Sequence, residues 1–240
     1  MIIDMHAHSK GVSRCCQRTY KENIDIAKNE GIDGIILTNH YEKSYVKYYE
    51  SIESLVEHYH QEYQKAKEYG ESVGVKVYYG VEITADQLPK SPNVHLLAYG
   101  VDESFLTEHP YIFDYPLDKM YETVKQYGGI LVQAHPFRCV DRLVDTKYLD
   151  GVEISCHPKY NTTSQERVKE VAKENGLIIT CGADYHGDTP YRPICGLVVD
   201  TLPKNIGEIV ELLTSSTTKT LLVHEVNEEK PIEFSYYRKK

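Results

Sequence analysis

Residues 1–8 read MIIDMHAH, a short apolar run followed by two histidines at positions i and i+2. In an extended chain, side chains two positions apart point to the same face. His6 and His8 can therefore bind one ion at the point where a strand ends and a loop begins. Histidine pairs of this spacing also occur by chance, so the argument depends on where the other histidines and acids fall.

Further residues that can bind metal follow other apolar, strand-like runs. They are His40, Glu82, His135, His157, Asp184 and His186. The run at 32–38, IDGIILT, has the β-branched character of a buried parallel strand. Strand ends of this kind are where barrels and open α/β sheets keep their chemistry. The pattern therefore predicts one site built from many strand ends.

Helical segments alternate with these runs. Capping boxes at 19–22 and 163–166 start two helices, residues 44–72 form a long helix or a pair, and Pro116 starts a helix that ends at Gly128. After residue 195 we expect a strand at 196–200, a helix from Pro203, a strand at 220–226 and a charged tail. Seven or more strand–helix units in 240 residues favour a closed barrel of parallel strands over an open sheet. Because no linker or repeat interrupts the pattern, we expect a single domain spanning residues 1–240.

Composition narrows the function classes. Hydrophobic content of 41% and charged content of 26% are typical of a soluble globular protein. The net charge of −9 argues against broad nucleic-acid binding, which depends on clustered Lys and Arg, but it allows a small phosphorylated substrate. The six cysteines show no CxxC spacing, and no apolar segment suggests a leader or a membrane span. We expect a cytoplasmic protein with reduced thiols and no membrane partner. Its oligomeric state is not predicted.

The donor set indicates a class of chemistry. Imidazole and carboxylate ligands together suit Zn, Mn or Fe. One carboxylate, such as Glu82, can use its two oxygens on two ions. Two ions roughly 3.5–4 Å apart are the arrangement used in phosphoester hydrolysis, and one of them lowers the pKa of a bound water from about 15.7 toward 7. No GxGxxG follows any of the strands, which argues against dinucleotide binding.

Six short motifs in order carry a family resemblance. They are DMHAH at 4–8, TNH at 38–40, GVE at 80–82, AHP at 134–136, Glu153-Ile154 followed by His157, and GADYH at 182–186. Their order and approximate spacing, from residue 1 to about 200, resemble the successive motifs of the PHP (polymerase and histidinol phosphatase) family. The resemblance implies a distorted (β/α)7 barrel with two or three metal ions at the C-terminal ends of its strands.

The resemblance also implies a ligand set. His6, His8, Glu82 and Asp184 would hold the first ion, Glu82, His135 and His157 the second, and His40 and His186 a third. Two positions depart from the family pattern. Asn39 stands where the family has Asp, and residues 13–16, SRCC, stand where many members carry Asp or His. The third ion would then use Cys15 as a thiolate, or its site is weak or empty.

Several residues keep alternative interpretations. Cys156 and His157 are adjacent and point to opposite faces of an extended chain, and we prefer His157 as the ligand. Arg138 can orient a substrate phosphate, or it forms a local salt bridge. Arg192 is a weaker candidate for the same phosphate role. His95 falls within a strand and is expected in the core or behind the ligands.

The leading hypothesis is a metal-dependent phosphoesterase that hydrolyses a phosphomonoester by a metal-bound hydroxide. Catalytic roles are predicted for Asp184, His186 and Arg138. The resemblance offers small-molecule esters, nucleotides and phosphotyrosine as precedents and does not select among them. Two alternatives remain open: a non-catalytic, metal-binding regulatory domain, and a metal-dependent hydrolase of C–N bonds.

Overall fold

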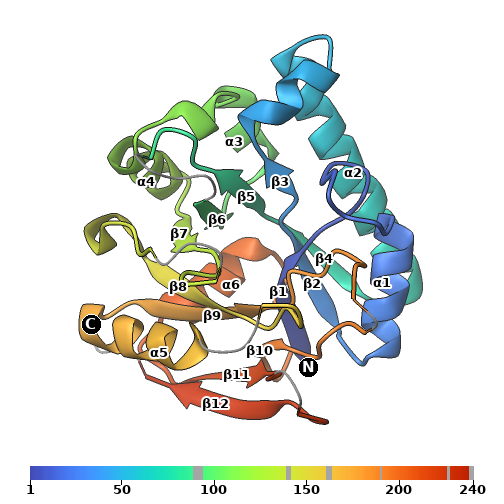
Figure 1. Cartoon of the computed structure of the whole chain (residues 1–240). Coiled ribbons are helices and arrows are strands. Elements are labelled where there is room, and N and C mark those ends of the chain that lie inside the picture. The colour runs from blue at the N-terminus through green and yellow to red at the C-terminus, as the bar shows by residue number, and fades with distance from the viewer. Residues whose placement is uncertain (89–93, 139–141, 161–163, 190, 226–227, 238–240) are drawn as a thin grey trace.

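The computed structural model describes residues 1–88, 94–138, 142–160, 164–189, 191–225 and 228–237. Its strands form two six-stranded sheets with helices around them (Figure 1). The first sheet has the order β12 (Ile232–Tyr236), β11 (Lys219–Val223), β10 (Gly196–Val198), β1 (Ile2–Ala7), β2 (Gly34–Leu37) and β4 (Lys76–Tyr79). The second has the order β3 (His40–Tyr41), β5 (Val81–Thr84), β6 (His95–Tyr99), β7 (Ile130–Gln133), β8 (Gly151–Ser155) and β9 (Ile178–Gly182). The predicted α/β class is confirmed.

The prediction of parallel strands throughout is wrong. Strands β1, β2 and β4 are parallel to one another, β3 is parallel to β5, and β7, β8 and β9 are parallel to one another. In contrast, β6 is antiparallel to both of its neighbours, β5 and β7. Strands β10, β11 and β12 extend the first sheet beyond β1 by antiparallel pairing. A parallel connection needs a crossover of a dozen or more residues. Residues 85–94 are too few for one, so the chain reverses between β5 and β6. Both sheets are therefore mixed.

The two sheets meet at two places. Gly80 alone separates β4 from β5, so one extended segment passes from the first sheet into the second. At the other junction, Ala7 and Tyr185 form a parallel bridge, and the amide of Asp184 donates to the carbonyl of His6 at 2.9 Å. The end of β1 therefore lies beside the segment that follows β9.

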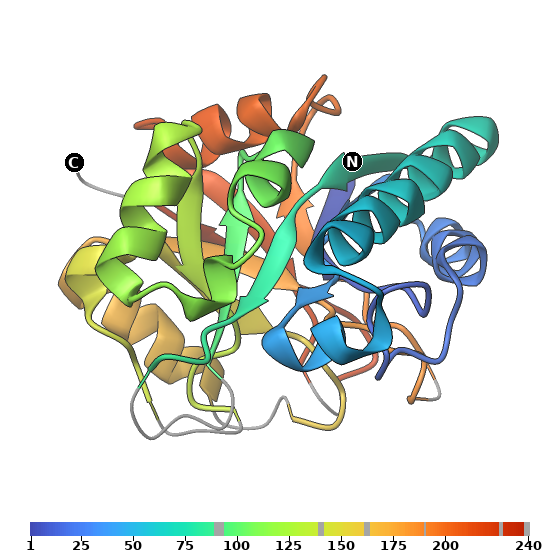
Figure 2. The same cartoon turned by 90° about the horizontal axis from the view of Figure 1, so that it is seen from above.

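Helices pack on the outer faces of both sheets. They are α1 (Tyr20–Asn29), α2 (Ile52–Val73), α3 (Glu103–Glu108), α4 (Leu117–Gln126), α5 (Ser164–Asn175) and α6 (Ile206–Thr214), with short 3-10 turns η1 (Lys43–Tyr48), η2 (Ile112–Asp114) and η3 (Thr146–Tyr148). Helices α1 and α2 lie side by side next to β4, and α5 covers β8 and β9 (Figures 1 and 2). Within the described part of the chain, no helix combines the length and apolar character that crossing a bilayer requires.

Local signals explain most helix boundaries. The predicted capping box at Thr19 is confirmed, because its hydroxyl accepts from the Glu22 amide while the Glu22 carboxylate accepts from the Thr19 amide. The helix after Pro116 is confirmed as α4. The expected cap at Thr163 lies outside the described residues. The helix predicted from Pro203 begins at Ile206, and the predicted charged tail contains strand β12, whose residues pair with β11.

Candidate metal centre

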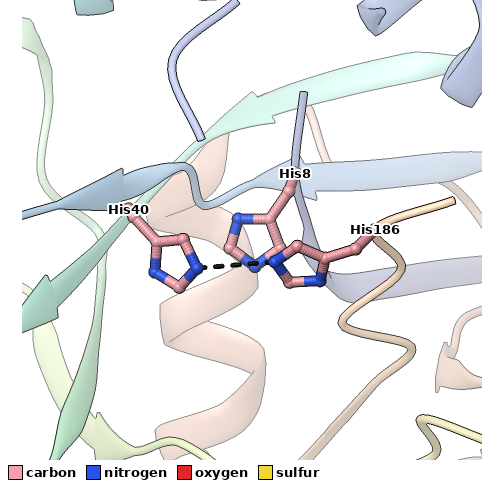
Figure 3. Close-up of side chains that lie close together, drawn as sticks. All are labelled: His8, His40 and His186. Carbon is pink, nitrogen blue, oxygen red and sulfur yellow. Dashed lines mark hydrogen bonds between the residues drawn. The ribbon is translucent and has the colours of Figure 1, made fainter. Parts of the chain in front are cut away.

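Histidines and acids from separate strands converge at one edge of the two sheets. His6 lies in β1 and His8 directly after it, His40 is in β3, and Glu82 is in β5. Figure 3 shows the imidazoles of His8, His40 and His186 facing one another from three different segments, with Nε2 of His186 3.4 Å from Nε2 of His40. The strand ends that carry these side chains therefore lie close together.

The predicted first-ion group is brought together. His6, His8, Glu82 and Asp184 each offer one ligand atom, and these atoms lie within 4.8 Å of one another. Nε2 of His8 is 2.8 Å from Oδ1 of Asp184, and Nε2 of His6 is 3.3 Å from Oε1 of Glu82. All four residues are buried. The arrangement is one that a single cation can occupy.

Only part of the predicted second-ion group gathers around Glu82. Nε2 of His135 is 3.3 Å from Oε1 of Glu82. Nε2 of His157 instead lies 3.4 Å from Oδ1 of Asp188, and its ring centroid is 6.3 Å from that of His186. His157 borders the cluster, and its role as a ligand stays a prediction.

The predicted third group contains a thiol. His40 and His186 form a group with His8. Desolvation raises the pKa of the Cys15 thiol, but hydrogen bonds with His186 and His40 outweigh it and bring the pKa to about 6. A thiol with this pKa is largely thiolate at neutral pH and so has the form that binds metal.

Several buried ligand atoms are left without hydrogen bonds. Among the described residues, Nε2 of His6, Nδ1 of His40 and Oε2 of Glu82 have no hydrogen-bond partner. Buried polar atoms are almost always paired, so each such atom needs an explanation. Oε2 of Glu82 lies 2.6 Å from Nδ1 of His40, a distance at which two ligands of one ion can stand. The donor set therefore fits divalent transition metals such as Zn, Mn and Fe.

Charge around the two central acids also fits a cation site. Burial raises the pKa of Glu82, but the nearby imidazoles of His40 and His6 hold it well below its usual range. Burial opposes ionisation of Asp184 as well, and His6 and Arg138 hold its pKa well below the usual value. Both carboxylates are therefore ionised and can act as anionic ligands.

Hydrogen bonds behind the ligands fix the ring orientations. Nδ1 of His6 lies 2.8 Å from Oε1 of Glu153, whose other oxygen accepts from the amide of His135 at 3.0 Å. When a cation occupies the cluster, Nδ1 of His6 would carry the proton toward Oε1 of Glu153, and Nε2 would present its lone pair to the ion. Supporting carboxylates of this kind are common behind histidine ligands.

A second relay explains the departure at Asn39. Oγ of Ser13 donates to Oδ1 of Asn39 at 2.9 Å, and Nδ1 of His8 lies 3.0 Å from the same hydroxyl oxygen. Since the Ser13 proton goes to Asn39, the Ser13 oxygen accepts the proton of His8 Nδ1. With a cation between them, Nε2 of His8 would present its lone pair to the ion that Asp184 also binds. Asn39 therefore supplies an acceptor through its amide oxygen.

The two arginines that were candidates for binding the substrate phosphate lie in different surroundings. Nη1 of Arg138 donates to Oδ2 of Asp184 at 2.5 Å, which places the guanidinium at the edge of the cluster. Arg192 is 1% exposed, and its Nη2 donates to Oδ2 of Asp4 at 2.6 Å. Asp4 in turn accepts from the amides of His6 and Ala183. The suggested phosphate role of Arg192 is therefore wrong, because this side chain supports the strand junction from within the core.

Two site residues have unusual backbone angles. His135 has φ of 31° and Asp184 has φ of 49°, in the left-handed region that residues other than glycine rarely adopt. Such conformations persist only where the surrounding structure imposes them, and they cluster at functional sites.

The sequence predicts His95 in the core or behind the ligands, and the structure places it beside Glu82. Its Nδ1 is 3.0 Å from Oε1 of Glu82, and it forms a ligand group with Glu82 and His40. Because β6 runs antiparallel, its first residue pairs with Thr84, the last residue of β5. The short connection at 85–94 was the signal that could have placed His95 at this edge.

These features define an α/β protein with a buried histidine–carboxylate centre at its strand ends. The PHP domain model matches residues 4–225. The chain therefore belongs to the PHP domain family, as the motifs predicted.

Solved structures share the fold at low sequence identity. A two-domain protein from Bacteroides vulgatus, containing a predicted PHP-like metal-dependent phosphoesterase, is 16% identical with a TM-score of 0.66, and the match covers 93% of this chain and 65% of that one. A protein named as a candidate metal-dependent phosphoesterase, from Bifidobacterium adolescentis, is 16% identical with a TM-score of 0.54, covering 89% and 96%. An amidohydrolase from Chromobacterium violaceum with bound sulfate is 16% identical with a TM-score of 0.61, covering 88% and 96%. No curated protein matches the chain.

Proposed function

We propose that this protein is a metal-dependent hydrolase of phosphomonoesters that uses two or three divalent ions. The observation that carries the proposal is Glu82, a buried and ionised carboxylate within 3.4 Å of five imidazoles, whose Oε2 has no hydrogen-bond partner among the described residues. One acid surrounded in this way can bridge two cations. When bound, such ions acidify a coordinated water and offset negative charge on the phosphate.

The protein side chains prepare the site for these ions and for the ester. Burial lowers the pKa of His135 to about 3, with Arg138 acting in the same direction, so this imidazole is neutral and keeps a lone pair for a cation. Asp184 and His186 flank the same space. Arg138 is held at the rim by Asp184 and by Oγ of Ser155, 3.2 Å from its Nη1. We assign to Arg138 the orientation of the substrate phosphate, for which a planar guanidinium is well suited.

The substrate in this proposal is a small phosphorylated compound, a nucleotide or a phosphotyrosine-type ester. The assignment to phosphate esters rests on Arg138 as the anion-binding group. The net charge of −9 disfavours long polyanions, which favours a small substrate. We also propose that the two sheets close as a distorted (β/α)7 barrel. The bridge between Ala7 and Tyr185 and the continuous passage through Gly80 support closure.

A phosphatase assay tests the function. The purified chain is loaded with Mn, Zn or Fe and offered p-nitrophenyl phosphate and a panel of natural phosphomonoesters, with EDTA as the metal-free condition. We expect release of inorganic phosphate that EDTA abolishes and that His135→Ala reduces by about 100-fold or more in kcat/KM. His109→Ala is the matched control, because His109 lies at the end of α3 and its Nδ1 contacts the Tyr115 hydroxyl. Equal losses in both variants would contradict the proposal.

The similarity to an amidohydrolase favours one second candidate, hydrolysis of a C–N bond. The released product distinguishes the two reactions. Amine release without phosphate release from a matched panel of amides and esters would support the second candidate. Inertness of the metal-loaded chain toward both panels would support a non-catalytic, metal-binding role.

A further inference from the structure

Three buried cysteines converge on the opposite side of β9 from the histidine cluster. Cys156 directly follows β8, Cys181 lies in β9, and Cys195 directly precedes β10. Their Sγ atoms all lie within 4.8 Å of one another, and those of Cys156 and Cys181 are 3.4 Å apart. Each of the three residues is at most 1% exposed.

Alternation along β9 separates this cluster from the histidine centre. Successive residues of a strand point to opposite faces. At Gly182 the strand approaches His6, so closely that an added Cβ would lie 2.4 Å from the His6 Cβ. At Cys181 the side chain faces β11, where its Sγ lies 3.4 Å from the carbonyl oxygen of Leu222. Strand β9 lies beside the antiparallel strands β10 and β11 (Figure 1). The three cysteines therefore occupy the space between β9 and these two strands.

The surroundings of one of the sulfur atoms, Sγ of Cys156, suit a metal-binding thiolate. Buried cysteines often act simply as small apolar side chains. Here three of them, far apart in the sequence, direct sulfur toward one point, and the backbone amide of His224 donates to Sγ of Cys156 at 3.3 Å. An N–H donor stabilises negative charge on its acceptor.

We propose that Cys156, Cys181 and Cys195 form a binding site for one soft, monovalent metal ion of the Cu(I) type. Thiolates select soft ions, chiefly Cu(I) and Zn. Structural zinc sites are almost always four-coordinate. Within the residues that the structure describes, the group contains only these three donors. A set of three sulfur atoms therefore favours an ion of low coordination number.

The nearest imidazole does not supply the fourth ligand. Nδ1 of His224 accepts from the amide of Ile194 at 3.3 Å, so its Nε2 carries the proton and donates to the carbonyl of Glu228 at 3.1 Å. Both ring nitrogens are therefore engaged. With metal–sulfur bonds of about 2.3 Å, three ligands around one ion stand about 4 Å apart, which is close to the present spacing.

A bound ion would connect three parts of the chain. It would tie the end of β8 and the middle of β9 to the start of β10, and thereby hold the antiparallel extension against the second sheet. Binding would release protons from thiols, because the thiolate is the ligand. This site is independent of the hydrolytic proposal.

The test uses the full chain in fully reduced, anaerobic form. The variant Cys15→Ser/Cys16→Ser/Cys139→Ser keeps only the three clustered thiols. It is titrated with Cu(I) in competition with a chromophoric Cu(I) chelator, and X-ray absorption of the loaded protein identifies the ligand atoms. We expect one Cu(I) per chain at the three thiols, with sulfur-only ligation. Adding Cys195→Ser is expected to weaken binding at least tenfold, with circular dichroism confirming the fold.

Three outcomes would overturn the proposal. They are copper bound without sulfur ligands, equal Cu(I) affinity after Cys195→Ser, and tighter binding of Zn(II) than of Cu(I) at the three thiols. The ligation result does not depend on the Cys195→Ser variant, so it decides the question even if that variant fails to fold. Zn(II) chloride serves as the competing probe in the last measurement.

Discussion

At the scale of single residues, the hydroxyl of Ser13 connects the two positions at which the sequence analysis noted departures from the motif pattern. It donates to Asn39, accepts from Nδ1 of His8, and also accepts from the backbone amide of His40 at 3.0 Å. One hydroxyl thus orients ligands from two strands. The amide oxygen of Asn39 is an acceptor in this arrangement, as a carboxylate oxygen would be.

Removing this hydroxyl should weaken metal binding. We expect Ser13→Ala to lower the affinity for Zn or Mn by about 10–100-fold, because groups behind a ligand have effects of this size. Competition with a fluorescent chelator measures the change. Ser9→Ala is the matched control, since the Ser9 hydroxyl hydrogen-bonds with Asn39 and, among the described residues, with no histidine. Equal effects of the two substitutions would argue against the relay.

Gly182 is the residue that lets β9 approach β1. A Cβ at this position would lie 2.4 Å from the Cβ of His6 and 2.7 Å from its backbone nitrogen. Backbone cannot move aside as a flexible side chain can, so we expect Gly182→Ala to destabilise the fold by about 1–3 kcal/mol. Urea unfolding measures this. The control is Gly207→Ala in α6, where the nearest atom is a side-chain oxygen at 3.1 Å and where alanine favours the helix. A Gly182→Ala variant as stable as wild type would refute the steric argument.

At the scale of secondary-structure elements, the sequence predicts those that carry strong local signals and misses those that depend on pairing partners. The strand at 32–38 and the helix after Thr19 form as expected, because apolar periodicity and capping act within a few residues. The direction of β6 depends instead on the length of the connection before it. Strand β12 is equally non-local, since its exposed residues are ordered by pairing with β11.

The same distinction applies to the site. Histidines that end parallel strands were found because the carboxyl ends of such strands share one edge. His95 was not predicted among the ligands because it begins an antiparallel strand, and only the reversal brings it beside Glu82. Glu153 was recognised within a motif, but its role behind His6 needed the distance of 2.8 Å. The order of the motifs therefore predicts which residues belong to the site, but it does not predict how their side chains are oriented.

The capping box of α1 supports a prediction about pH. Hydrogen bonds from the Thr19 amide and hydroxyl lower the pKa of Glu22. A carboxyl group with a depressed folded-state pKa stabilises the fold above its unfolded value, near 4.3, and this contribution is lost as pH falls through the folded-state pKa. We therefore expect the stability difference between wild type and Glu22→Ala to shrink as pH falls below about 4.3. Chemical unfolding at several pH values measures it, and a difference that stays constant with pH would count against the cap.

At the scale of the whole molecule, the site is also the junction of the two sheets. Its ligands span the chain from His6 to His186, and the backbone pair between His6 and Asp184 lies in their midst. Without cations, protons must compensate the acids. Burial disfavours the charged form of His6, but Glu153 and Asp184 raise its pKa well above the usual value, so this ring takes up positive charge. Bound cations would balance the charge of the buried acids in place of these protons, and they would connect strands from both sheets.

Removing metal should therefore loosen this junction more than the rest of the fold. Ions at 100 times their dissociation constant stabilise a native state by about 2.7 kcal/mol, so EDTA should lower Tm. Hydrogen exchange should locate the effect: we expect faster exchange of the Asp184 amide, which donates to His6 at 2.9 Å, and little change in the ladder between β11 and β12. That ladder is the internal control, because its residues belong to neither histidine group nor cysteine group. A uniform increase in exchange across both regions would mean that the ions stabilise the fold without acting at the junction.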